Sequence, residues 1–312
     1  MSDTSGGDHS RRPDAGMNAV MKEQRQLLNL AYRLLGSLAD AEDVVQETYT
    51  RWYSMPVQRR EGIGSPGAWL TTVASRICLD VLASARVRRE RYVGEWLPEP
   101  VPGGSAWISG RVDGTGVDPA DRVTLDESVS MAFLVVLEAM TPAERVAFVL
   151  HDIFRYSFAE VADIVGRTPA ACRQLASSAR RRLRGPQLAT ASADGHAGIV
   201  KAFKQAWETH DIDRLVALLA PDATATGDGG GLVMAALQPI EGAEQIASFF
   251  VERAEAAPHV TILERTVNGQ PGLVAQVDDV PVSVLAFGIS CDRIQHIWAV
   301  LNPDKLRPWK AS

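Results

Sequence analysis

The sequence of 312 residues predicts a multidomain protein with two all-α units, the second carrying a helix-turn-helix, and a C-terminal α+β domain. Apolar residues recur at helical spacing through 18–92 and again through 122–185. A stretch rich in proline and glycine separates those two parts, and strand-like runs follow helices after residue 198. We therefore divide the chain into a disordered tail 1–17, a helical unit 18–92, a linker 93–121, a helical unit 122–185, a linker 186–197 and a domain 198–312.

Local signals place the helices of the first unit. Four leucines and an alanine predict a first helix that ends at Gly36: Leu27, Leu28, Ala31, Leu34 and Leu35. We expect Asp40 to cap a helix over 41–53, and 54–64 to form a loop. Ser65 followed by a proline starts a further helix that runs to about Tyr92, because proline at the first position loses no hydrogen bond.

Residues 157–184 carry the strongest motif, a helix-turn-helix. Thr141 with Glu144, and Ser157 with Glu160, have the spacing of capping boxes. Gly166 stops one helix, and Thr168 caps the next, which Gly185 and Pro186 end. On this last helix we predict an inward face of Ala171, Leu175, Ala179 and Leu183, and an outward face of Ala170, Arg173, Gln174, Ser177, Arg181 and Arg184.

The outward face has the chemistry of a nucleic-acid reader. Arginine can bond guanine bidentately, glutamine can bond adenine, and small residues allow a helix to enter the major groove. Although the net charge is −6, no acid lies between Asp163 and Asp194, and Arg86 to Arg91 form a second basic run broken only by Glu90. Phosphate attraction depends on such local patches. A helical hairpin with a solvated basic face is the alternative that the charge alone leaves open.

The C-terminal part, residues 198–312, is more acidic, with nine Lys and Arg against 14 Asp and Glu. Helices are expected around Val200 to Trp207, around Leu215 to Leu219 and over 242–256. Strand-like runs at His259–Thr266, Leu273–Val277, Val282–Phe287 and Ile294–Leu301 predict a curved antiparallel sheet.

Three segments together resemble a known family. LLNLAYRLLGSLADAEDVVQETYTRWY, PGAWLTTVASRICLDVLASARVRRERY and the stretch from LEAMTPAERVAFVLHDIF to ACRQLASSARRRL are similar to the two conserved domains of extracytoplasmic-function sigma factors. The resemblance implies that the first domain binds core RNA polymerase and melts the promoter −10 element, and that the second reads the −35 element. It covers about residues 18–185.

The resemblance also assigns roles to residues. Polymerase contacts are expected from an acidic helix: Asp40, Glu42, Asp43, Gln46 and Glu47. Contacts near −10 are expected from Arg59, Arg60, Trp69, Arg76, Arg86 and Arg88. Contacts at −35 are expected from Thr168, Ala170, Arg173, Gln174, Ser177, Arg180, Arg181 and Arg184. Taken alone, the acids could simply stabilise a helix start through its dipole.

Residues 198–312 resemble SnoaL-like domains of the nuclear-transport-factor-2 cone fold. Sigma factors with such a domain carry three further motifs, which this chain has as Trp96-Leu97-Pro98-Glu99-Pro100, Asp228-Gly229-Gly230-Gly231-Leu232 and Asn302-Pro303-Asp304-Lys305-Leu306. The resemblance implies intramolecular control by the extra domain and no separate anti-sigma factor. A locally collapsed linker and a simple β-turn are the alternatives for the first two motifs.

Other function classes remain to be weighed. Cone folds also host isomerases and cyclases, which need a carboxylate or histidine in an apolar pocket, and here Asp222, Asp228, His259 and His296 are available. Asp222 is better explained as a turn residue, so we expect no catalytic residues, although a pocket for a small-molecule signal stays open. A stand-alone repressor would leave the first helical unit without a role.

Cysteines and histidines are too scattered for a disulfide framework or a metal site. We therefore expect no metal and no cofactor. The chain has no apolar run long enough to span a membrane and no signal peptide, which favours a cytoplasmic protein whose partners are core RNA polymerase and promoter DNA.

Overall fold

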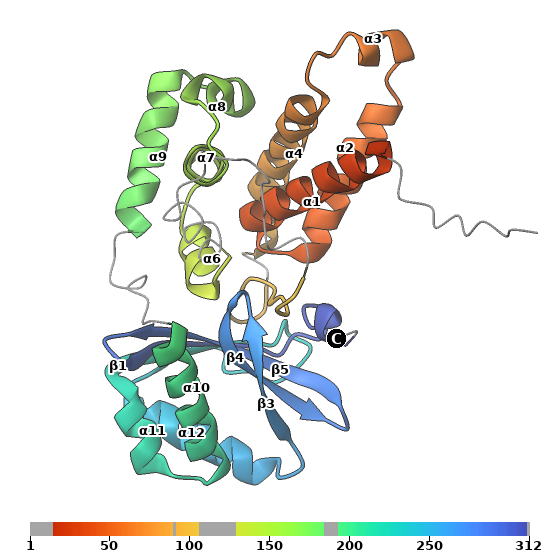
Figure 1. The fold of residues 1–312 in the computed structure, drawn as a ribbon. Coiled ribbons are helices and arrows are strands. Elements are labelled where there is room, and N and C mark those ends of the chain that lie inside the picture. Colours follow the sequence, from red (N-terminus) through yellow and green to blue (C-terminus); the bar gives the residue numbers. More distant parts are fainter. Residues whose placement is uncertain (1–14, 90–91, 106–128, 184–192, 311–312) are drawn as a thin grey trace, which may run out of the picture.

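The computed structural model describes residues 15–89, 92–105, 129–183 and 193–310. Two helical units lie side by side on one face of a domain built around a sheet (Figure 1). The first helix already begins at Ala15, so the predicted tail is too long by three residues, and its remainder falls outside the described part.

The first unit consists of α1 (Ala15–Leu35), α2 (Leu38–Tyr53), α3 (Val57–Glu61) and α4 (Pro66–Arg89). The predicted cap of the second helix is wrong, because Ser37 caps α2 and its hydroxyl accepts the Asp40 amide at 3.2 Å. Ser37 has the extended backbone that an N-cap requires, whereas Asp40 is already helical. The expected loop 54–64 contains the short helix α3.

The second unit consists of α6 (Met131–Glu138), α7 (Pro142–Phe148), a π-helical turn (Val149–Ile153), α8 (Phe158–Val165) and α9 (Pro169–Leu183). Both predicted capping boxes are confirmed, with the Thr141 and Ser157 hydroxyls each bonded to the amide three residues on. Gly166 ends α8 at φ 68°, a conformation that glycine adopts without strain. Residues 184–192 lie outside the described residues, including the predicted stop at Gly185.

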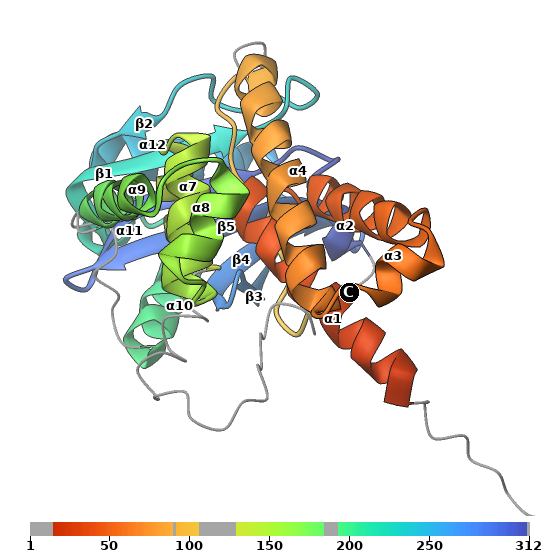
Figure 2. The same cartoon turned by 90° about the horizontal axis from the view of Figure 1, so that it is seen from above.

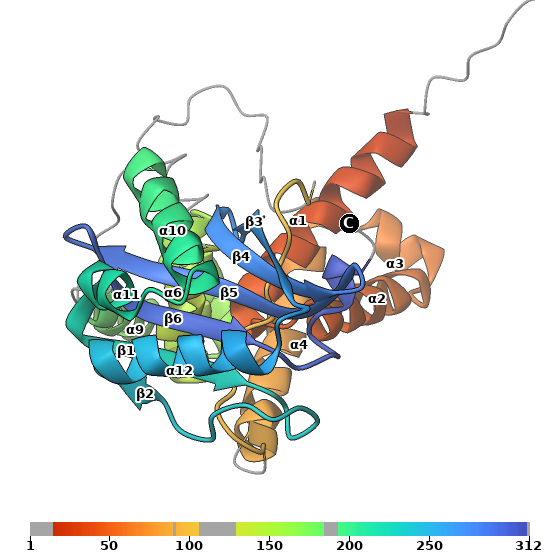
Figure 3. The ribbon, with the colours of Figure 1, turned by 90° about the horizontal axis from the view of Figure 1, so that it is seen from below.

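The C-terminal domain begins with α10 (Ala193–Glu208) and α11 (Ile212–Leu218). Six strands form one sheet in the order β2-β1-β6-β5-β4-β3, and α10, α11 and α12 cover one of its faces (Figure 3). The remaining elements are β1 (Leu219–Asp228), β2 (Ile240–Glu241), α12 (Ala243–Ala256), β3 (Thr261–Val267), β4 (Gln270–Val277), β5 (Val280–Ser290), β6 (Arg293–Val300) and a 3₁₀ turn (Arg307–Trp309).

Two predictions for this domain are wrong. The sheet is mixed rather than antiparallel, because β1 runs parallel to β6. Asp222 lies within β1 and not in a turn. The alternation of buried Ala223 and Ala225 with half-buried threonines is the signal of a strand with one covered face, but this run is short and its alanines are only weakly apolar.

The buried apolar residues form three clusters. One belongs to the C-terminal domain itself and lies between its sheet and its helices. A second runs without interruption through both helical units, which pack directly against each other (Figure 2). The third joins linker and domains, because Leu97 and Met131 pack against the sheet residues Val284 and Trp298. The domains therefore share cores, and the linker is part of one of them.

Candidate nucleic-acid interface and interdomain site

The carboxylate of Asp228 is the centre of the interdomain site. It lies at the end of β1 with its side chain fully buried. It accepts hydrogen bonds from the Tyr92 hydroxyl at 2.6 Å, the Leu97 amide at 2.9 Å and the Lys305 ammonium at 2.6 Å. Both Tyr92 and Leu97 belong to the chain between the helical units, so one carboxylate holds that chain at two points.

Lys305 completes the site from the other side. Its ammonium also donates to the Leu97 carbonyl at 2.5 Å and lies 4.1 Å from the centroid of the Trp96 ring, within reach of a cation–π contact. A buried ion pair is tolerated when additional hydrogen bonds satisfy both charges, as these do. Burial beside the Asp228 carboxylate raises the pKa of the Tyr92 hydroxyl, which therefore stays a donor.

The glycines after Asp228 allow neighbouring segments of the chain to approach the backbone closely. A Cβ atom on Gly230 would lie 2.3 Å from the Asn302 amide nitrogen, and one on Gly229 would lie 2.2 Å from the Val233 carbonyl oxygen. The Asn302 side chain donates to the Tyr92 hydroxyl at 2.9 Å. Leu306 joins the shared core, whereas Pro303 is half-buried and Asp304 is exposed. The structure thus brings the three motifs of the sequence together, and the glycine run is a turn as well as a contact.

Glu99 ties the same linker to the first helical unit. Its carboxylate accepts the Leu38 amide at 2.7 Å, and its own amide donates to the Gly36 carbonyl at 2.7 Å. The Tyr32 hydroxyl donates to the Glu99 carbonyl at 2.7 Å. Burial raises the pKa of the Glu99 carboxyl, while the amides at the start of α2 favour its ionised form. Pro98 and Pro100 are buried on either side of it.

Asn268, which the sequence reasoning missed, joins all parts of the chain. Its side chain donates to the Tyr32 hydroxyl at 2.7 Å and to the Val129 carbonyl at 3.0 Å, and accepts the Val101 amide at 3.0 Å. It sits at φ 50° between β3 and β4, a conformation that asparagine tolerates in tight turns. The Asn268-Gly269 dipeptide signals a hairpin turn in the sequence, but nothing in it signals the distant partners.

The helix-turn-helix presents most of the predicted outward face of α9. Ala170, Arg173, Gln174, Ser177 and Arg181 are exposed, and the Thr168 hydroxyl accepts the Ala171 amide. Arg180 differs, because its guanidinium forms two hydrogen bonds to Asp152 at 2.6 and 3.1 Å. Arg184 lies outside the described residues.

The predicted inward face of α9 is partly wrong. Cys172, Ala176 and Ala179 are buried, whereas Ala171, Leu175 and Leu183 are half-buried. The buried stripe is therefore rotated towards Cys172. The reason is that a period of four residues drifts around a helix that has 3.6 residues per turn.

The residues predicted near −10 are spread over the first unit. Arg59 is exposed, Arg60 lies 5.8 Å from the Tyr53 ring centroid, and Trp69 packs on Trp52 with ring centroids 5.2 Å apart. Arg76 instead donates to the Asp163 carbonyl of α8 at 2.8 Å, so it contacts the second helical unit. The side chains of Arg86 and Arg88, near the end of α4, lie outside what the structure describes.

The acidic face of α2 is open to solvent. Glu42, Asp43, Gln46 and Glu47 are exposed and Asp40 is half-buried. Glu47 pairs with Arg51 at 2.8 Å one turn later, an exposed pair of little energetic weight. These acids extend well beyond the first turn of α2, so the helix dipole alone does not account for them.

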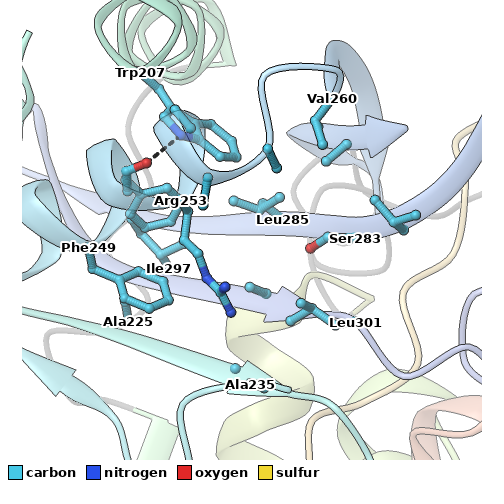
Figure 4. A pocket seen from close by; sticks show the side chains of 18 of the residues that line it. Trp207, Ala225, Ala235, Phe249, Arg253, Val260, Ser283, Leu285, Ile297 and Leu301 are labelled. Atoms are coloured by element: carbon cyan, nitrogen blue, oxygen red, sulfur yellow. Dashed lines mark hydrogen bonds between the residues drawn. The ribbon is translucent and has the colours of Figure 1, made fainter. Parts of the chain in front are cut away.

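A cavity of about 820 Å³ lies in the C-terminal domain between the sheet and α12 (Figure 4). The four groups considered for catalysis, Asp222, Asp228, His259 and His296, do not line it. Burial lowers the pKa of His296, whose Nδ1 lies 2.8 Å from the Thr224 hydroxyl. Within the described residues, no helix is both long and apolar enough to span a bilayer.

Three family models match successive parts of the chain. Sigma-70 region 2 matches residues 19–88, Sigma-70 region 4 matches residues 130–183, and a SnoaL-like domain matches residues 200–279. The first two matches cover the two helical units, and the third covers most of the C-terminal domain.

Similar proteins extend over nearly the whole chain. The ECF RNA polymerase sigma factor SigJ of Mycobacterium tuberculosis is 39% identical over 295 residues, covering 90% of both chains. The probable sigma factor SigI of the same species is 35% identical, covering 91% of this chain and 92% of its own. The crystal structure of SigJ matches with a TM-score of 0.71 and 36% identity over 93% of this chain and 98% of SigJ. The chain therefore belongs to the extracytoplasmic-function sigma factors, which direct RNA polymerase to promoters, and carries a fused C-terminal SnoaL-like domain.

Proposed function

We propose that the SnoaL-like domain regulates this sigma factor by holding the linker between regions 2 and 4. The observation that carries the proposal is the buried Asp228 carboxylate, which bonds Tyr92 just before the linker, Leu97 within it and Lys305 of its own domain. A tethered domain meets its partner at an effective concentration near the millimolar range, so a modest contact is already largely occupied.

The packing of the two sigma regions supports an inhibitory control by this domain. Regions 2 and 4 share one core, and Arg76 of region 2 bonds the Asp163 carbonyl of region 4. The −10 and −35 elements are named for positions about 25 base pairs apart. At a rise of about 3.4 Å for each base pair, they lie roughly 85 Å apart along the duplex. Two domains of about 60 to 75 residues, each roughly 30 Å across, cannot reach both elements while packed together. The linker contacts therefore oppose promoter engagement.

The proposal includes the external partners. The exposed acids of α2 bind core polymerase, α9 reads the −35 element, and the basic residues of region 2 act near −10. The protein works in the cytoplasm, needs no separate anti-sigma factor and is not an enzyme. In support of the last point, the four groups considered for catalysis from the sequence do not line the cavity. The similar proteins that match nearly the whole chain are sigma factors.

In vitro transcription with core polymerase tests the regulatory contact. We expect Asp228→Asn, which weakens the pair with Lys305, to raise promoter-dependent transcription, and Trp96→Ala and truncation after residue 190 to change it in the same direction. Asp222→Asn, exposed on the same strand, is the matched control and should leave transcription unchanged. Equal activity of Asp228→Asn and the wild type would overturn the regulatory proposal, and a response to Asp222→Asn would favour a role in chemistry.

A second experiment tests polymerase binding. The double substitution Asp43→Lys and Glu47→Lys should weaken the affinity for core polymerase while the circular dichroism spectrum stays unchanged. Glu244→Lys with Glu252→Lys makes the same change in net charge on exposed positions of α12 and should leave affinity as it is. Equal loss in both variants would assign the effect to net charge and would contradict a binding face on α2.

A further inference from the structure

The cavity of the SnoaL-like domain has the size and lining of a small-molecule site. Its volume of about 820 Å³ falls within the ordinary range of ligand pockets, roughly 300 to 1,000 Å³. Most of its lining is apolar, with Trp207, Phe249, Phe250, Ile297 and Leu301 among the larger side chains. Thr226 and Ser283 add two hydroxyl groups, and the indole nitrogen of Trp207 already donates to the Phe250 carbonyl at 2.8 Å.

Arg253 is the only lysine or arginine among the described lining residues. Its guanidinium carbon lies 5.5 Å from the Phe249 ring centroid, and in Figure 4 the guanidinium lies between the side chains of Phe249 and Leu301. Its hydrogen bond to the Met234 carbonyl is long, at 3.4 Å, and leaves donors for a further acceptor. Arg253 is itself exposed, as are the other ionisable lining groups, Glu208, His210 and Glu255, and Glu208 pairs with Lys204 at 3.3 Å.

The rim of the cavity is continuous with the segment that holds the linker. Directly after Gly231, the loop 232–237 exposes four large apolar side chains: Leu232, Val233, Met234 and Leu237. Val233 and Met234 line the cavity, while Gly231 lies against Val93 and Leu237 approaches Gly94. A molecule that reorders this loop therefore acts at both the cavity and the linker.

We propose that the cavity binds an apolar small molecule with one anionic head group, with the apolar part between α12 and the sheet and the head paired with Arg253. The apolar lining favours such a molecule over a polar metabolite, and Arg253, as the one lysine or arginine of the described lining, favours a single negative charge. Its occupancy controls the hold on Tyr92 and Leu97 through residues 229–237. This last step rests on the proposed regulatory function, whereas the site itself does not.

Two dyes with the same ring system test the site on the full-length protein. 8-Anilinonaphthalene-1-sulfonate carries one anionic group, and N-phenyl-1-naphthylamine is its uncharged counterpart. We expect both to bind with a stoichiometry of one. Arg253→Gln should weaken the sulfonate dye about three- to tenfold, as expected for one partly exposed charge-assisted contact, and leave the neutral dye unchanged. Arg265→Gln, exposed on β3 outside the cavity, is the matched control.

Filling the cavity separates this site from other apolar surfaces. Ser283→Phe should abolish binding of both dyes, whereas Val280→Phe, exposed on the same strand and outside the cavity, should not. The assignment is overturned if neither dye binds the wild type, which is the result expected when a segment of the chain itself fills the cavity. It is also overturned if Ser283→Phe still binds the dyes. An equal effect of Arg253→Gln on both dyes would overturn the anionic head group. Asp228→Asn should still bind one molecule of each dye, with an affinity changed only by the coupling between cavity and linker, so failure of the regulatory contact and failure of the site are distinguishable.

Discussion

The recognition helix α9 and the Asp228 site both concentrate polar side chains, but in opposite settings. Arg173, Gln174 and Ser177 are exposed on α9, where the guanidinium of Arg173 lies 5.2 Å from the Phe158 ring centroid. Asp228 and Lys305 are buried, and their partners come from the linker and from each other. Polar groups on the surface cost the fold little, whereas a buried charge must be matched within the molecule. The comparison supports the proposal that α9 acts on an external partner and that the Asp228 site acts on the protein itself.

The largest effect should come from breaking the buried ion pair. Lys305→Met leaves the Asp228 carboxylate buried without its cation, which should lower the free energy of unfolding by about 3 to 5 kcal/mol. Arg307→Met, which breaks an exposed pair with Asp304 at 3.2 Å, should cost no more than about 1 kcal/mol. Urea denaturation of both variants measures the difference. Similar values would show that Asp228 is not held as a buried charge.

Asn268→Gly should have the next largest effect. Glycine keeps the positive φ of this turn but removes three side-chain hydrogen bonds, two of them to main-chain groups of Val101 and Val129. We expect a loss of about 2 to 4 kcal/mol in unfolding free energy, because buried partners are left unsatisfied. The matched control is Asp278→Gly, which is also at positive φ but in an exposed turn. Equal stability of both glycine variants would contradict the joining role of Asn268.

On α9 the effects should appear in DNA binding and not in folding. Arg173→Ala should cost about 1 to 3 kcal/mol and relax the preference at one −35 position if it reads a base. Arg181→Ala should weaken binding to all sequences and flatten the salt dependence, as a phosphate contact does. Titrations on matched and mismatched duplexes at two salt concentrations separate the two. A uniform loss with Arg173→Ala would reassign it to the backbone.

The smallest effect concerns Glu99 and pH. Burial raises the pKa of its carboxyl, so the folded protein binds this proton more tightly than the unfolded chain does. The unfolding free energy should therefore fall as the pH rises from the ordinary glutamate range through the raised pKa. Glu99→Gln should flatten that slope, and Glu95→Gln, exposed in the same linker, should retain it. Parallel pH profiles of the wild type and Glu99→Gln would rule out this contribution.

Features encoded over short distances were predictable from the sequence. Ser157 and Glu160 are three residues apart, so their capping box depends only on local geometry. The exposed face of α9 follows from the helical repeat in the same way. The three motifs around Trp96, Asp228 and Asn302 were recognised by resemblance, because no local rule places residues that are more than 70 positions apart beside one another.

Features that depend on distant partners were missed. The side chain of Asn268 bonds Tyr32, 236 positions away in the sequence, and nothing around either residue indicates the other. Strand β1 was missed because its alternating alanines and threonines are only weakly apolar. Its stability as a strand depends on pairing with β6, which the local sequence does not indicate. The pairing of Arg180 with Asp152 likewise depends on how α9 packs, and its sequence alone suggested a free basic side chain.

The distance between regions 2 and 4 tests the central claim most directly. Labels at Gln58→Cys on α3 and Ala159→Cys on α8 would report it, with the native Cys78, Cys172 and Cys291 replaced. We predict a single narrow distance distribution for the full-length protein and a broader, longer one for Asp228→Asn and for the chain ending near residue 190. Identical distributions in all three proteins would contradict the account and would leave the SnoaL-like domain without a hold on the sigma regions.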